Sequence, residues 1–160
     1  MLWPIIAWVM SAPSGNYILA ERALDACKYG KGADPYAVMA LLEIEEEAGL
    51  PAHARMILPA TWCVEASMRN PGNLRGDHGA ARGPMQGHGW LWKWCGVKHG
   101  AWDDLESAAR CYLGRVVAIY ERAEKKCPGR GWEVAEAMTA NSPRYKWKCD
   151  SKSDHWRAKQ

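Results

Sequence analysis

The sequence lacks the short motifs that mark several common enzyme classes. It has no P-loop, no GxSxG and no HExxH, so no motif supports a P-loop nucleotide hydrolase, an α/β-hydrolase or a zincin. CxxC pairs are also absent, which argues against a zinc ribbon or a thioredoxin motif. A metal site could be drawn from His78, His88, His99 and Cys95, but their spacing fits no metal-binding pattern. We expect no metal and no cofactor.

Long hydrophobic runs are absent as well. The run at the start, Leu2–Met10, has about nine apolar residues and is too short to span a bilayer. No Lys or Arg precedes it, so the basic region of a signal peptide is missing. We interpret residues 1–13 as an apolar N-terminal segment that docks on the fold, with a weak export signal as the alternative, and we predict no stable membrane span.

The net charge is only +3, and it is concentrated at one end. Residues 142–160 carry six Lys or Arg against two Asp, which makes a basic C-terminal tail. This tail is either simply solvated or suited to an anionic polymer such as cell wall, nucleic acid or lipid. It also contains Trp147 and Trp156, but no strand platform for stacking bases is predicted, so we expect no nucleic-acid partner.

Phenylalanine is missing, whereas tryptophan occurs ten times in 160 residues. Tryptophan can stack on sugar rings or bases, but it also fills cores. With 48% hydrophobic residues, the chain is long enough for one globular domain, residues 1–160. No alternating β pattern of useful length is present, so we predict an all-α fold. Helices are expected at about 15–29, 34–48, 59–69, 89–95, 104–126 and 131–140, with a short helical connection over 51–58.

Local signals place several helix ends. Asp34-Pro35 begins one helix and Gly49 ends it. Asp103 and Glu106 have the spacing of a capping box. The helix before Gly49 ends in an acidic run that is expected to be a solvated face, formed by Glu43, Glu45, Glu46 and Glu47.

The six cysteines allow two interpretations. Cys27, Cys63 and Cys111 fall within helical patterns, where a free Cys acts as a small apolar residue. Cys127 and Cys149 lie in turn or tail regions and could pair in an oxidising compartment.

The stretch Thr61–Trp90 holds the candidate chemistry. Glu65 is a single acid in an apolar helical segment, near the helix C-terminus, and both settings favour its protonated form. A general acid needs this property, although an ordinary ion pair with Arg69 is the competing interpretation. A glycine-rich loop follows and contains a second acid, Asp77, which is either a water-activating base or an Asx-type loop cap. Two carboxylates across a cleft can cleave a glycosidic bond.

Three motifs carry a family resemblance. They are Glu65-Ala-Ser, then Gly76-Asp-His-Gly with Gly83-Pro-Met-Gln, and finally Thr139-Ala-Asn. Together they resemble the lysozyme-like superfamily of peptidoglycan-cleaving enzymes, whose members include soluble lytic transglycosylases and goose-type lysozymes. The family pattern has Glu-Ser, Gly-Leu-Met-Gln and Ala-Tyr-Asn, so this chain departs from it at Ala66, Pro84 and Ala140. The similarity covers about residues 34–145.

The resemblance implies a lysozyme-like fold with a glycine-rich active-site loop. Glu65 would be the catalytic acid, and Asp77 would position water. The sugar cleft would be lined by Gly83, Met85, Gln86, His88, Asn141 and Tyr145. His88 stands near the place where the goose-type branch has a further acid.

The implied function is cleavage of the β-1,4 bond between N-acetylmuramic acid and N-acetylglucosamine. Hydrolysis would use both acids, whereas lytic transglycosylation would use Glu65 alone and form 1,6-anhydro ends. A catalytically inactive glycan-binding or structural phage tail protein is the remaining alternative. The expected partners are the peptidoglycan strand and other phage virion or tail proteins, and the expected location is the virion or the extracellular or periplasmic side of the cell wall.

Overall fold

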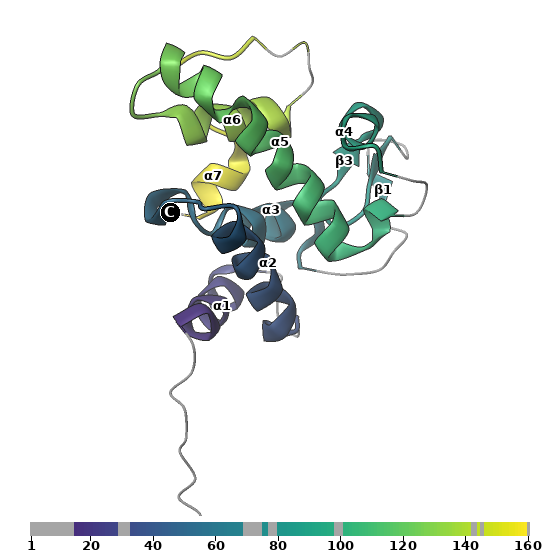
Figure 1. The fold of residues 1–160 in the computed structure, drawn as a ribbon. Coiled ribbons are helices and arrows are strands. Elements are labelled where there is room, and N and C mark those ends of the chain that lie inside the picture. Colours follow the sequence, from purple (N-terminus) through teal and green to yellow (C-terminus); the bar gives the residue numbers. More distant parts are fainter. Residues whose placement is uncertain are drawn as a thin grey trace, which may run out of the picture.

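Helices form most of the chain that the structure, a computed structural model, describes (Figure 1). The described residues are 15–28, 33–68, 75–76, 80–97, 101–141, 144 and 146–159. In chain order the helices are α1 (Gly15–Ala26), α2 (Pro35–Glu47), η1 (Ala52–Ala54), α3 (Ile57–Ala66), α4 (Gly89–Cys95), η3 (Ala101–Asp103), α5 (Leu105–Lys126), α6 (Gly131–Ala140) and α7 (Asp154–Ala158). The mainly helical prediction is confirmed.

The helix ends follow local chemistry, with two corrections. Asp34 accepts a hydrogen bond from the Tyr36 amide at 2.9 Å and caps α2, as expected. Helix α5 is capped by Asp104, whose carboxylate accepts from the Ser107 amide at 2.9 Å, so the box predicted at Asp103 is wrong. Helix α3 ends at Ala66 and not at 69, because the next two residues have positive φ.

The core forms around α5, which contacts α2, α4 and α6. The face of α5 that is buried in the core includes Leu105, Ala109, Tyr112, Leu113, Val116, Ile119 and Ala123, whereas Tyr120 is only partly buried against the core. Trp62 from α3, Trp92 from α4 and Trp156 from α7 are buried in the same core. Core packing therefore accounts for several of the tryptophans.

Three disulfides connect the helices. Cys27–Cys63 joins the end of α1 to α3, Cys95–Cys111 joins α4 to α5, and Cys127–Cys149 joins the end of α5 to the C-terminal segment. The expected Cys127–Cys149 pair is confirmed. For Cys27, Cys63 and Cys111 the sequence left the disulfide state open; all three are paired, because tertiary packing brings their Cα atoms within 6 Å of a partner. Three bridges are typical of a protein that matures in an oxidising environment.

A small antiparallel sheet lies beside α4 and was not predicted (Figure 1). Its strands are β1 (Arg75–Gly76), β2 (Ala81–Arg82) and β3 (Gly87–His88), in the order β1-β2-β3. Residue Ala81 pairs with His88, and the tight turn Gly83–Gln86 connects the last two strands. Two-residue strands leave no periodic signal in a sequence.

Part of the C-terminal segment packs into the fold, although five of its six basic residues are exposed, namely Arg144, Lys146, Lys148, Lys152 and Arg157. Ser153 caps α7, its hydroxyl accepting from the Trp156 amide at 3.1 Å. The helix packs between α3 and α6 (Figure 1), and His155 and Trp156 are buried. Within the described ranges, no helix is both long and apolar enough to cross a membrane.

Candidate active site

A pocket brings together residues from five helices and from the turn before β3. Five residues predicted from the sequence line it, namely Glu65, Met85, Gln86, His88 and Asn141. The other lining residues are Gly87, Trp90, Leu91, Tyr112, Thr139, Ala140 and His155. Glu65 and Asn141, which are 76 residues apart in the chain, therefore line the same pocket.

Glu65 lies one residue before the end of α3, and its side chain is 31% exposed. The helix stops there because Ser67 and Met68 adopt left-handed backbone, with φ of 52° and 53°. The Glu65 carboxylate reaches the pocket and forms a short hydrogen bond through Oε1 to Nε2 of His155. Arg69, the partner in the competing interpretation, lies outside the described residues.

The other end of α3 is held by a buried carboxylate. Glu45 of α2 is fully buried, so the predicted solvated face is wrong at this position. Its two oxygens accept from the amide of Met56, the N-cap residue of α3, at 2.7 Å and from the amide of Leu58, in the first turn of α3, at 2.8 Å. Burial raises the pKa of Glu45 to about 7, opposed by these two hydrogen bonds and by Arg55. This contact and the Cys27–Cys63 bridge fix the helix that carries Glu65.

The turn Gly83–Gln86 forms the opposite wall. Gly83 has φ +75°, and a Cβ there would lie 1.9 Å from the carbonyl oxygen of Trp102, so only glycine fits. Gly83 is buried and shapes the turn without lining the pocket. Met85 is buried in the wall, and the Gln86 amide donates from Nε2 to the Gly83 carbonyl at 2.8 Å. The Met and Gln side chains are thus held in place by the turn itself.

Asn141 lies at the C-terminal end of α6, as its motif predicts. Its Nδ2 donates to the Ala137 carbonyl at 2.7 Å, which satisfies one of the last carbonyls of the helix. The predicted residues Asp77 and Tyr145 lie outside the described residues, as do His78 and His99. Cys95 is bonded to Cys111, so it is no thiolate ligand for a metal. Among the described residues, no cluster of side chains could hold a metal ion.

Behind Glu65 lies a buried polar network that the sequence reasoning missed. Glu136 of α6 is fully buried, and its Oε1 accepts from the Tyr112 hydroxyl at 2.5 Å. The same oxygen is 2.8 Å from Nδ1 of His155, and Ser153 donates to Oε2. The imidazole of His155 therefore bridges Glu136 and Glu65, one carboxylate at each ring nitrogen.

This network changes the protonation of its members. Burial alone would lower the pKa of His155, but hydrogen bonds to Glu136 and Glu65 and their charges outweigh it and raise the value to about 9. His155 is therefore an imidazolium at neutral pH. Burial and the neighbouring Glu136 raise the pKa of Tyr112 well above its usual value, so its hydroxyl stays protonated.

The sequence contains weak signals for this network. Glu136 stands in an apolar run, Val134–Met138, just as Glu65 stands in its own apolar segment. Ser153 precedes His155 and Trp156 with the spacing of an N-cap. Because residues 142–160 are rich in Lys and Arg, we interpreted them as a tail and did not predict a helix after Ser153.

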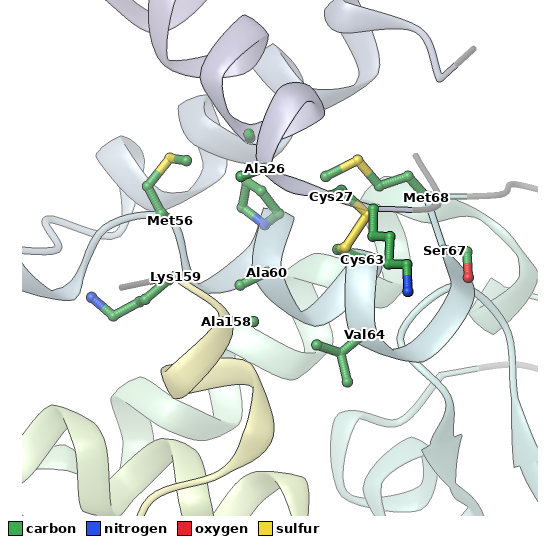
Figure 2. Close-up of a pocket in the computed structure, with 13 residues that line it drawn as sticks. Ala26, Cys27, Met56, Ala60, Cys63, Val64, Ser67, Met68, Ala158 and Lys159 are labelled. Carbon is green, nitrogen blue, oxygen red and sulfur yellow. A yellow bond between two sulfur atoms is a disulfide. The ribbon is translucent and has the colours of Figure 1, made fainter. Parts of the chain in front are cut away.

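A larger pocket of about 420 Å³ lies between α1, α3 and α7 (Figure 2). Met56, Val64, Met68 and the Cys27–Cys63 bridge give it a mostly apolar lining. Its charged lining residues are Lys28 and Lys159, and neither a carboxylate nor an imidazole lines it. Of these two pockets, the smaller one at Glu65 is the one lined by a carboxylate and an imidazole.

No family model, curated protein or solved structure matches this chain. The chemistry of the Glu65 pocket is therefore the basis for assigning a function.

Proposed function

We propose that this protein is a peptidoglycan-cleaving glycosidase of lysozyme-like fold, with Glu65 as its general acid. One observation carries the proposal: Glu65, the Met85-Gln86 turn and Asn141 line a single pocket, although they lie far apart in sequence. These are the positions at which the chain resembles lysozyme-like enzymes.

The chemistry follows from the position of Glu65. Its carboxyl would protonate the bridging oxygen of the β-1,4 bond between N-acetylmuramic acid and N-acetylglucosamine. Gln86, His88 and Asn141 offer polar groups for the sugars, and Trp90 offers apolar surface. In a hydrolase, Asp77 would then position the attacking water, as the resemblance implies.

Lytic transglycosylation is the second candidate, because one carboxylate in the pocket is sufficient for it. Among the described residues that line the pocket, Glu65 is the sole carboxylate. A transglycosylase needs one such group, which first protonates the leaving oxygen and then takes the proton of the muramic acid 6-hydroxyl. The product would carry a 1,6-anhydro end in place of a reducing end.

The disulfides support action outside a reducing cytoplasm, in a periplasmic, extracellular or virion setting. The peptidoglycan strand would be the principal partner. Other phage virion or tail proteins would be partners if the enzyme is carried on a particle.

The test is clearance of purified cell walls by the wild-type protein and by Glu65→Gln. A matched control is Glu43→Gln, which changes an exposed glutamate on α2. We expect wild type and control to clear walls and Glu65→Gln to lose at least about 10²-fold in rate, the usual contribution of a general acid. Equal clearance by Glu65→Gln would exclude Glu65 as the acid. Binding of walls without clearance by the wild type would instead support the glycan-binding alternative.

A further inference from the structure

We propose that His155, held by Glu136, is a positioning residue for Glu65: its imidazolium orients the Glu65 carboxyl and stabilises the carboxylate that remains after proton donation. The inference rests on the proposed function, because it assigns to Glu65, the proposed general acid, a neighbouring residue that positions it. It brings a C-terminal residue outside the three motifs into the reaction.

The hydrogen bonds fix the protonation of Nδ1. An ionised Glu136 can only accept, and it takes hydrogen bonds from Tyr112 and Ser153. The Tyr112 hydroxyl has one proton, which goes to Glu136 Oε1 at 2.5 Å. Nδ1 of His155 lies 2.8 Å from Glu136 Oε1 and 2.9 Å from the Tyr112 oxygen. Two acceptors thus face Nδ1, so Nδ1 carries a proton and donates it toward them.

The opposite nitrogen then acts on Glu65. The short contact between Nε2 and Glu65 Oε1 needs one proton between the two atoms. When the imidazolium holds that proton, it donates to Oε1 and holds this oxygen in place, so the proton that Glu65 gives to the substrate is carried by Oε2. The second oxygen, Oε2, is then the one available to the leaving group of the substrate.

The proton balance of the step is simple. Glu65 donates its proton to the glycosidic oxygen as the bond from that oxygen to C1 breaks, and the electron pair of the bond stays on the oxygen. The resulting Glu65 carboxylate accepts from the Nε2–H of His155. In the second half of the reaction the carboxylate takes a proton from the hydroxyl group or water that attacks C1, which restores the starting state.

Groups from every neighbouring element face His155. They are Glu65 from α3, Tyr112 from α5 and Glu136 from α6. On its own helix, Asp154 and Arg157 pair with each other at an exposed position, and Lys159 donates to the carbonyls of His53 and Arg55. The two carboxylates therefore dominate the field at the imidazole, and both favour its charged form.

A cation beside the acid also affects the pH dependence of the reaction, because a positive charge stabilises a neighbouring carboxylate. In His155→Gln, the Gln side chain can still donate a hydrogen bond but carries no charge. A positional role alone would lower the rate at all pH values, whereas the charge also moves the alkaline limb of the pH–rate profile.

The experiment measures the wall-digestion rate across pH for wild type, His155→Gln and the control His53→Gln, which changes an exposed histidine. We expect the alkaline limb of His155→Gln to move up by about one pH unit and that of His53→Gln to stay in place. If His155→Gln folds and its pH–rate profile has the same alkaline limb as that of the wild type, the inference is overturned and the proposed function is left intact. Absence of digestion by the wild type would instead remove the proposed function.

A second measurement covers the case in which His155→Gln does not fold. Nitrogen-15 NMR of the histidine rings follows the titration of His155 in wild type and in Glu65→Gln. We expect the neutral glutamine to lower the titration midpoint of His155 by about one pH unit. An unchanged midpoint would show that the two groups are not coupled and would overturn the inference without any activity assay.

Discussion

Raising the pH should destabilise the fold through His155. The pKa of this residue is about 9 in the folded protein, against an ordinary value of 6.5. Because the folded value is raised, the stabilisation is complete below pH 6.5 and is lost as the pH rises through about 9. At about 1.4 kcal/mol per pKa unit, the difference between the folded and the ordinary pKa of His155 corresponds to about 3 kcal/mol of unfolding free energy. Screening by solvent is small because the side chain is only 5% exposed.

Urea unfolding followed by tryptophan fluorescence can measure this loss. The assay compares wild type with His155→Gln at several pH values between about 6 and 9.5, a range below the titration of most Lys and Tyr. We expect the stability advantage of the wild type to shrink by about 3 kcal/mol across that range. All six cysteines are paired, so no free thiol starts disulfide exchange at the alkaline end. Parallel stability curves for the two proteins would refute a charged His155 in the native state.

Three further variants test the stability of the fold. Replacing Cys127 and Cys149 together by Ser should lower the unfolding free energy by about 3 kcal/mol, as expected for a bridge that closes a loop of this length, and an unchanged midpoint in thermal unfolding would contradict this. Gly83→Ala should cost more than about 2 kcal/mol, because its Cβ would strike the Trp102 carbonyl at positive φ, and wild-type stability in urea would show that the turn relaxes freely. Glu45→Ala should cost roughly 2–4 kcal/mol, because it leaves two amides of the first turn of α3 without their acceptor, and a loss no larger than that of the exposed control Glu43→Ala would contradict this account.

The sequence predicts those parts of the fold that depend on local signals. Helices α4 and α6 begin and end where their apolar patterns and flanking residues place them, at Gly89–Cys95 and Gly131–Ala140. The pocket residues Glu65, Met85, Gln86 and Asn141 were found because their motifs resemble those of known enzymes. In the structure these four residues line one pocket.

The remaining features depend on contacts between distant residues. Glu45 looks like its exposed neighbours in sequence, and only the approach of α3 makes it a buried acceptor. His155 lies 90 residues from Glu65, in a segment whose basic composition suggested a solvated tail. The partner of Cys63 could not be chosen from spacing either, because six cysteines allow fifteen pairings.

Mass spectrometry of digested peptidoglycan tests the central claim most directly. Purified walls would be incubated with wild type, Glu65→Gln and the Glu43→Gln control, and the soluble glycan fragments would then be analysed. We predict that wild type and control release disaccharide-peptides cut at N-acetylmuramic acid and that Glu65→Gln releases almost none. Reducing ends would identify a hydrolase and 1,6-anhydro ends a transglycosylase. Walls left uncut by the wild-type protein, or cut equally by Glu65→Gln, would contradict the assignment of Glu65 as the acid of a peptidoglycan glycosidase.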